Sequence, residues 1–366
     1  METNLPKLMK AQLLDDFKKP YEFRSIPLPT ISSPHDLLIK VDAASYCHTD
    51  AVLAEGLMPP FPTTFPHISC HEFAGTVVSL PSLITPFKLG DRVGVPGRAF
   101  HPCGKCFECS STSGPEDDRE GYSVFCPSAG NHGISRAGGF AEYAVVDSRQ
   151  VAPIPENLTA VETAPLMCAG LTIFAALKKC GLKEGQRVGI MGCGGGLGHL
   201  GLQFATKMGY KVLGMEAADG PLELAKSLNT GARIVDVKLE SASEIVSQLG
   251  KEDGKNEKTE MGLDAVIILP ESQKAFEYGM KLLRNRGKCV VVSFPDEGFH
   301  FSAGDVVFRQ IDIVGSLVGS NGTLREMLAF AAEKGIRAKV RCFGLGELNA
   351  LVEEYKKGEG GSWLLI

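Results

Sequence analysis

The chain has 366 residues, of which 44% are hydrophobic and 22% charged, which suits two globular domains with sizeable cores rather than one. A formal net charge of −5 argues against a nucleic-acid-binding protein and against a polybasic membrane patch. The N-terminus lacks the apolar run of a signal peptide, and no apolar stretch reaches the ~18 residues of a membrane helix, so we expect a cytoplasmic protein.

The first 165 residues are predicted to be rich in β-strands. Short apolar segments alternate there with proline and glycine turns, which is typical of antiparallel sheets. The clearest of these segments are Leu37–Val41, Gly75–Val78 and Phe140–Val146.

The same region holds a scattered set of metal-ligand residue types. A lone cysteine and a lone histidine are usually core residues, but Cys47 and His71, with the later Cys168, offer two thiolates and one imidazole. Such a set binds zinc and leaves one position open for water or substrate. Spacing alone does not group the three residues, because no short motif links them.

Four further cysteines form a compact pattern: Cys103, Cys106, Cys109 and Cys126. Strict two-residue gaps let tight turns aim three thiolates at one point, and the fourth completes a tetrahedron around a structural zinc ion. A disulfide framework is the alternative, which suits a chain without a secretory signal poorly. The other five cysteines are expected to be buried thiols: Cys70, Cys180, Cys193, Cys289 and Cys342.

From Arg187 onward the pattern changes to alternating strands and helices. A strand over Val188–Met191 is followed by a glycine cluster, a helix with apolar positions three and four apart, and a strand over Lys211–Met215. This alternation predicts a parallel sheet covered by helices, an α/β doubly wound fold. The later predicted strands are Arg233–Val237, Leu263–Leu269, Lys288–Phe294 and Asp312–Gly315.

The glycine cluster Gly192–Gly198 indicates a dinucleotide site. Glycines between a strand and a helix let the backbone approach a pyrophosphate at the helix N-terminus. Cys193 occupies a position where strict spacing needs glycine, so the turn is expected to carry an extra residue. Glu216, at the end of the next strand, favours NAD over NADP because a carboxylate accepts ribose hydrogen bonds and repels a 2′-phosphate. The alternative is that Glu216 is an ordinary solvated acid.

In sequence order, the motifs resemble those of the medium-chain zinc alcohol dehydrogenases, and the microbial, ethanol-dehydrogenase-like branch is most similar. The resemblance covers nearly the whole chain and reaches Val314–Gly319. Besides the cysteine run and the glycine cluster, it rests on Cys47-His48-Thr49-Asp50, His71-Glu72-Phe73-Ala74-Gly75, Gly138-Gly139-Phe140-Ala141-Glu142-Tyr143 and Cys168-Ala169-Gly170-Leu171-Thr172.

The resemblance implies two zinc ions per chain and NAD(H). Cys47, His71 and Cys168 would hold the catalytic zinc, which is the ligand set known for this family. Glu72 would be an exchangeable ligand, and Asp50 would orient His71. Thr49 would hydrogen-bond the substrate hydroxyl and begin proton removal. The implied cofactor contacts are His48, Thr172, Gly195, Gly196, Leu197, Gly198, Glu216, Leu269, Ser316 and Val318.

The fold implied is a GroES-like β-rich catalytic domain, residues 1–165 and 305–366, carrying both zinc sites, plus a Rossmann domain, residues 166–304. The expected activity is hydride transfer between NAD(H) and a small alcohol, aldehyde or ketone, by a homodimer or homotetramer with no nucleic-acid or membrane partner. A zinc-free enone or quinone reductase on the same fold is one alternative, although that class normally lacks the catalytic ligands. A non-catalytic nucleotide- or zinc-binding protein is the other.

Three departures from the family pattern stand out. The segment between Cys109 and Cys126 is longer than usual and polar, which a flexible loop accommodates at little cost in free energy. Val52 stands where the proton relay usually ends in a histidine. Ser362, followed by Trp363, replaces an arginine that pairs with the cofactor phosphates.

Overall fold

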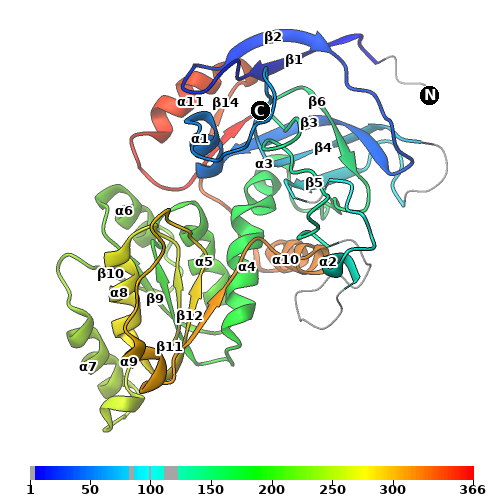
Figure 1. Cartoon of the computed structure of the whole chain (residues 1–366). Helices are drawn as coiled ribbons and strands as arrows, with labels where there is room; N and C mark the ends of the chain where they lie inside the picture. Colours follow the sequence, from blue (N-terminus) through cyan, green and yellow to red (C-terminus); the bar gives the residue numbers. More distant parts are fainter. Residues whose placement is uncertain (1–4, 82–85, 99, 111–122) are drawn as a thin grey trace. The chain divides into compact units, whose positions relative to one another are not determined.

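The computed structural model describes residues 5–81, 86–98, 100–110 and 123–366. The chain divides into two compact units, which are described separately below (Figure 1). Unit 1 comprises Met1–Leu171, Gly319–Lys357 and Ser362–Ile366, and unit 2 comprises Thr172–Val318 and Gly358–Gly361. The long loop predicted between Cys109 and Cys126 lies largely outside the described residues.

Unit 1 is built on a mainly antiparallel sheet in the order β14-β15-β3-β4-β5-β7, with β6 also paired to β3. A separate ribbon pairs β1 with β2. The core contains Phe73 and Phe140, both fully buried. The strands are β1 (Leu8–Leu13), β2 (Glu22–Pro27), β3 (Asp36–Tyr46), β4 (Glu72–Ser79), β5 (Arg92–Pro96), β6 (Tyr143–Asp147), β7 (Ala152–Pro153), β14 (Val340–Phe343) and β15 (Ser362–Leu365).

The helices of unit 1 are short, apart from α10. Helix α10 begins after Ser320, whose hydroxyl accepts a hydrogen bond from the Thr323 backbone, and ends at the left-handed Gly335. These elements are α1 (His48–Ala54), α2 (Phe107–Ser110), α3 (Ala160–Thr163), the 3₁₀ turn η1 (Ala164–Met167), α10 (Asn321–Lys334), η3 (Leu345–Glu347) and α11 (Leu348–Tyr355). Helix α4 (Ala169–Cys180) begins in unit 1 and continues into unit 2.

Unit 2 contains a six-stranded parallel sheet in the order β10-β9-β8-β11-β12-β13. Numbered along the unit, this order is 3-2-1-4-5-6, which defines the Rossmann topology. The central strands β8 and β11 are largely buried because helices cover both faces of the sheet. The six strands are β8 (Arg187–Met191), β9 (Lys211–Glu216), β10 (Arg233–Asp236), β11 (Leu263–Ile268), β12 (Leu283–Val291) and β13 (Asp312–Gly315).

Helices α5 and α6 contact each other beside β8 to β10, and α7 and α8 form a second contacting pair (Figure 1). The chain runs from β8 outward to β10 on one side of the sheet and then from β11 outward to β13 on the other side. Because the connections are right-handed, the two helix pairs lie on opposite faces of the sheet. Ser241 and Glu244 form a capping box that starts α7. The bounds are α5 (Gly196–Lys207), α6 (Asp219–Ser227), α7 (Ala242–Glu252), η2 (Lys258–Glu260), α8 (Gln273–Leu282) and α9 (Ala303–Val307).

The predicted fold class is confirmed, a β-rich unit and a doubly wound parallel unit. The units meet in sequence at Gly319 and not at residue 305, because β13 pairs with β12 and belongs to the parallel sheet. Within the described residues no single helix is long and apolar enough to cross a membrane. One bent pair, Ala160–Met167 with Ala169–Cys180, meets that length and composition only when joined.

Candidate metal centres

Cys47, His71 and Cys168 come together within unit 1, although they are far apart in sequence. Cys47 caps α1, His71 immediately precedes β4, and Cys168 follows η1. Their ligand atoms all lie within 4.8 Å of one another, and His71 Nε2 is 3.3 Å from Cys168 Sγ. Two thiolates and one imidazole at these separations fit a tetrahedral zinc ion with one position left open.

Asp50 fastens the segments that carry two of these ligands. Its carboxylate is buried and accepts backbone hydrogen bonds from Cys47 (2.9 Å) and Cys70 (2.9 Å), next to His71. His71 Nδ1 lies 3.8 Å from Asp50 Oδ1, in ion-pair range but beyond a hydrogen bond, and has no other partner within the described chain. Asp50 therefore fixes the ligand backbone directly and faces the His71 ring.

Glycines make room for the segment that carries His71. A Cβ at Gly97 would lie 2.2 Å from His71 Cβ. A Cβ at Gly138 would lie 2.0 Å from the Cys70 carbonyl oxygen, and one at Gly139 would lie 2.5 Å from the Phe73 ring. The Gly138-Gly139 pair, which the sequence offered only as a family motif, is thus a packing surface for this ligand segment.

The charges of the three candidate ligands depend on one another. Interaction with Cys168 holds the pKa of the Cys47 thiol well below its usual value, against the effect of burial. The same interaction, with burial, raises the pKa of Cys168. Burial lowers the pKa of His71, but the charges of Cys47 and Asp50 outweigh it and raise that pKa. Without a metal, the three ligand side chains therefore share a proton, and a bound metal cation would displace that proton.

The neighbouring predicted residues take different positions. The Cys47 sulfur lies 3.7 Å from the Thr49 hydroxyl. Glu72 is buried at the start of β4, accepts a long hydrogen bond (3.4 Å) from the Ala169 backbone, and is outside the ligand cluster. His48 is exposed, and its Nδ1 lies 3.0 Å from the Tyr355 hydroxyl on α11. No feature of the sequence pointed to Tyr355.

The four-cysteine cluster forms as its spacing predicts. The sulfurs of Cys103, Cys106, Cys109 and Cys126 lie within 4.8 Å of one another. The Cys106 and Cys126 sulfurs are 3.8 Å apart, which matches the edge of about 3.8 Å of a tetrahedron with Zn–S bonds of about 2.3 Å. Four thiolates close the site, so a zinc ion there would have no position left for substrate.

The remaining cysteines follow the prediction with one exception. Cys70, Cys180, Cys193 and Cys289 are buried free thiols. Cys342 was also expected to be buried, and this prediction is wrong, because it is exposed on β14 at the edge of the sheet.

The glycine cluster of unit 2 forms a tight turn between β8 and α5. Gly195 caps the helix, and Gly192 has a φ of +78°. A Cβ at Gly194 would lie 1.9 Å from the Pro221 carbonyl oxygen, and one at Gly198 would lie 2.1 Å from the Gly192 oxygen. The loop therefore requires glycine at both positions and presents backbone at the start of a helix, which suits a pyrophosphate.

The other residues expected to contact the cofactor in unit 2 follow the carboxyl ends of parallel strands, where Rossmann folds bind dinucleotides. Glu216 ends β9, and its carboxylate accepts hydrogen bonds from the backbone of Gly194 (3.1 Å) and Ala217 (2.8 Å). Leu269 follows β11, while Ser316 and Val318 follow β13; the buried Ser316 hydroxyl has no hydrogen-bond partner within the described residues. Thr172 lies on α4.

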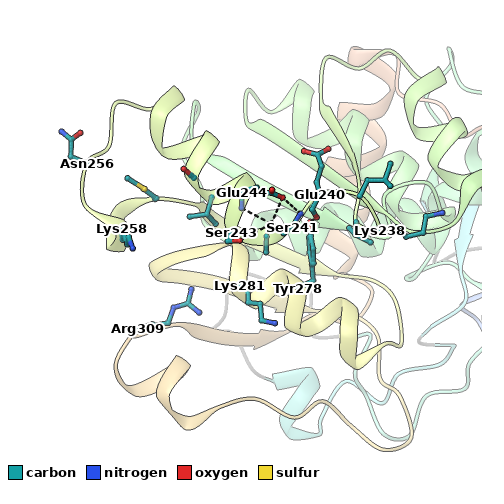
Figure 2. A pocket seen from close by; sticks show the side chains of 16 residues that line it. Lys238, Glu240, Ser241, Ser243, Glu244, Asn256, Lys258, Tyr278, Lys281 and Arg309 are labelled. Carbon is teal, nitrogen blue, oxygen red and sulfur yellow. Dashed lines mark hydrogen bonds between the residues drawn. The ribbon is translucent and has the colours of Figure 1, made fainter.

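A hollow of about 1150 Å³ lies between α7 and α8 on unit 2 (Figure 2). Charged and hydroxyl side chains line it, including Lys238, Ser241, Tyr278 and Arg309. None of the predicted site residues lines it. Figure 2 shows Ser241 and Glu244 hydrogen-bonded in the α7 cap, so these polar groups serve the helix. We therefore place the candidate chemistry at the ligand cluster of unit 1.

Comparison with known proteins agrees with this geometry. Residues 33–156 match the family model "Alcohol dehydrogenase GroES-like domain", and residues 196–333 match "Zinc-binding dehydrogenase". An alcohol dehydrogenase of Geobacillus stearothermophilus is 35% identical, over 96% of each chain. The chain belongs to the medium-chain zinc alcohol dehydrogenases.

Two solved structures of this family show the same architecture. The alcohol dehydrogenase of Aeropyrum pernix is 26% identical with a TM-score of 0.81, over 98% of this chain and 99% of that one. A putative zinc-binding dehydrogenase from Sinorhizobium meliloti, bound to NADP, is 26% identical with a TM-score of 0.83, over 99% and 100%. In a zinc alcohol dehydrogenase, the open three-ligand cluster and the closed four-cysteine cluster have distinct uses, one catalytic and one structural.

Proposed function

We propose that the chain is a zinc-dependent alcohol dehydrogenase that uses NAD(H) to interconvert a small alcohol and its aldehyde or ketone. The observation that carries this proposal is the convergence of Cys47, His71 and Cys168 in one cluster with an open fourth position. A closed set of ligands would indicate only a structural metal.

The residues around the cluster have separate tasks in this proposal. Zinc supplies the Lewis acidity that lowers the pKa of a substrate hydroxyl, and the nicotinamide takes up the hydride. Asp50 holds the backbone beside two ligands, so their geometry is set before substrate arrives. Thr49, beside the Cys47 sulfur, accepts the substrate proton. Val52 on α1 has no donor or acceptor to pass it on, so the proton leaves through water or through His48.

Glu216 supports NAD(H) as the cofactor. Its carboxylate sits at the end of β9, bonded to the backbone of the glycine loop, and adds negative charge where NADP carries its 2′-phosphate. Because the S. meliloti relative binds NADP, the preference needs direct measurement. A ratio of kcat/KM values that favours NADP(H) would refute this part of the proposal.

A homo-oligomer is the second part of the proposal. Strand β13 is the edge of the parallel sheet, and large apolar side chains around it are exposed. Edge strands with apolar surroundings pair readily with another copy. The exposed side chains are Phe294, Phe301, Val307, Phe308 and Leu317. Light scattering should give a multiple of the chain mass of 39.1 kDa; the single-chain mass would contradict the oligomer.

A cytoplasmic location completes the proposal. All eleven cysteines are free thiols, and seven of them form the two ligand clusters. Zinc–thiolate sites need reduced cysteines, which a reducing compartment maintains. The expected partners are a small alcohol or carbonyl substrate and further copies of the chain, with no nucleic acid and no membrane.

The test is oxidation of an alcohol panel with both cofactors, combined with metal analysis of the same preparation. We expect two zinc ions per chain and NAD-linked oxidation. Enone reduction by zinc-free protein would instead identify a reductase on the same fold. Zinc and cofactor binding without turnover would identify a non-catalytic protein.

A further inference from the structure

Arg98 stands beside the catalytic ligand cluster but belongs to none of the features described above. Strand β5 ends at Pro96, which pairs with Glu72 at the start of β4. Gly97 then packs against His71, so closely that a Cβ added at Gly97 would lie 2.2 Å from His71 Cβ. Arg98 therefore leaves the sheet next to a zinc ligand, within unit 1.

Within the described residues, the guanidinium of Arg98 makes one hydrogen bond and one ring contact. Its Nε donates a hydrogen bond to the Val124 carbonyl oxygen (3.2 Å), and its Cζ lies 5.7 Å from the centre of the Phe125 ring. No carboxylate of the described residues lies within 4.0 Å of it, whereas Arg149 in the same unit pairs with Asp147. The two terminal amino groups of Arg98 thus have no acidic partner in the part of the chain that the structure describes.

These amino groups are not fully enclosed by the described residues. Arg98 is half-buried, and none of its nitrogens is among the fully buried atoms that lack a hydrogen bond. Burial lowers the pKa of the guanidinium, and the nearby Cys168 offsets this only in part. Among the described residues this half-buried cation has no carboxylate partner, which is unfavourable, and a bound anion would offset that desolvation.

We propose that Arg98 binds a carboxylate group of the substrate. The alcohols and aldehydes that this enzyme prefers would then carry a carboxylate a few bonds from the reacting carbon. Arginine suits this task because its planar fork forms two parallel hydrogen bonds to a carboxylate. The inference rests on the proposed alcohol dehydrogenase activity and names its substrate class.

A purely electrostatic role for Arg98 makes a different prediction. Asp50 and Glu72 are buried near the same ligands, and one arginine would offset part of their negative charge. In that case removing Arg98 should impair neutral and anionic substrates alike. Only direct binding of the substrate by Arg98 makes the loss of kcat/KM larger for substrates that carry a carboxylate.

The experiment compares ω-hydroxy carboxylates of two to six carbons with 1-alkanols of matched length. The variants are Arg98→Met, which keeps the stem and removes the charge, and Arg98→Lys, which keeps the charge and removes the fork. Arg92→Met is the matched control. It lies at the other end of β5, and its guanidinium binds the carbonyls of Leu158 and Pro155.

We expect the wild type to favour the hydroxy carboxylate at one or more lengths. Arg98→Met should lower the ratio of kcat/KM values, carboxylate over alkanol, by about 10- to 100-fold, and Arg98→Lys by less. Arg92→Met should leave the ratio within about twofold. An unchanged ratio in Arg98→Met, or equal losses on both substrates, would overturn the proposal.

A binding measurement keeps this test separate from the proposed activity. In the zinc-loaded wild type, butanoate should bind more tightly than butanamide by calorimetry, and Arg98→Lys should reduce the difference. Equal binding of the two would overturn the role of Arg98 even in an active enzyme. If the wild type oxidises no alcohol, the proposed function fails, while butanoate binding still decides the role of Arg98.

Discussion

The two metal centres of unit 1 use similar ligands but are assembled in opposite ways. Cys103, Cys106 and Cys109 follow one another at two-residue gaps, so local turns bring their sulfurs together. Cys168 lies 97 positions after His71, and the packing of η1 against β4 brings their ligand atoms within 3.3 Å. A site built by local turns can be read from spacing, whereas a site built by the fold can be recognised only through resemblance or structure.

The two centres also differ in their surroundings. Cys103 and Cys106 are half-buried, and no carboxylate of the described residues hydrogen-bonds to them as Asp50 does to Cys47. His71 and Asp50 are almost fully buried, and the glycines Gly97 and Gly138 allow backbone to pack closely around the ligand segment. The first centre fastens a loop, and the second holds its ligands in a preset geometry, as catalysis requires.

The largest expected effect distinguishes the two centres by activity. Cys47→Ala should lower kcat by about 10³-fold or more, because general acid–base and metal assistance both depend on that cluster. Cys103→Ala should reduce thermal stability and leave kcat of the folded fraction within about tenfold. Steady-state kinetics with thermal unfolding checks both. Comparable loss of turnover in the two variants would contradict the division of roles.

We expect His132 to make the stability of unit 1 depend on pH. Its ring contacts Phe73, two residues after His71 in the sequence, and Phe100, three residues before Cys103. Burial lowers the pKa of His132 to about 4, from a usual value of about 6.5. Between these values the unfolded chain binds a proton that the folded chain does not. The free energy of unfolding should therefore fall as pH drops from about 6.5 to 4, by up to about 3 kcal/mol.

The variant His132→Phe should remove that part of the pH dependence. Urea unfolding at pH 5 and pH 7.5 measures it, and above pH 7 the variant and the wild type should show parallel pH profiles. If the free energy of unfolding falls by the same amount in both proteins between pH 7.5 and 5, His132 is not the source of this pH dependence.

A third prediction concerns another contact that only the fold creates. The segment Gly358–Gly361 packs against the glycine loop of unit 2, and Gly361 donates a hydrogen bond to the Gly194 oxygen (3.3 Å). A Cβ at Gly360 would lie 2.4 Å from that oxygen, whereas one at Gly358 would meet nothing within 4 Å. Both residues have left-handed φ values, +77° and +69°.

Gly360→Ala should displace the glycine loop and weaken NADH binding by about tenfold. Gly358→Ala has the same backbone strain without the contact, so it is the matched control, and its Kd should stay within about twofold. Fluorescence titration of NADH measures both. Equal Kd values in the two variants would show that the contact does not shape the cofactor site.

The last comparison tests a residue that sequence analysis identified directly. Glu216→Ala should narrow the preference for NAD over NADP, since it removes a ribose acceptor and a source of repulsion, together worth about 1–3 kcal/mol. The ratio of kcat/KM values for the two cofactors measures the change. A preference as strong as in the wild type would mean that Glu216 only supports the glycine loop through Gly194.

Sequence analysis was most successful for features that are set by neighbouring residues in the chain. The strand over Asp312–Gly315 was predicted with its observed bounds, and the helix after the glycine cluster has the predicted apolar side, with Leu200 and Phe204 buried. The alternation of strands and helices also placed Asp312–Gly315 in the parallel sheet, where it pairs with β12, whereas the boundary at residue 305 that the resemblance implied falls before this strand.

Residues that act through long-range contacts left no local signal. Tyr355 reaches His48 across 307 positions, and Gly97 is required only because His71 packs against it. Cys342 was expected to be buried like other apolar thiols, but its strand forms the sheet edge, and the order of strands decides such exposure.

The zinc content of three proteins tests the central claim most directly. Native mass spectrometry of the wild type, Cys47→Ala and Cys103→Ala should find two, one and one zinc ions per chain, since each substitution removes a ligand from one cluster and leaves the other intact. A wild type with a single zinc ion, or a Cys47→Ala variant that retains both, would contradict an account in which two independent centres divide structure from chemistry.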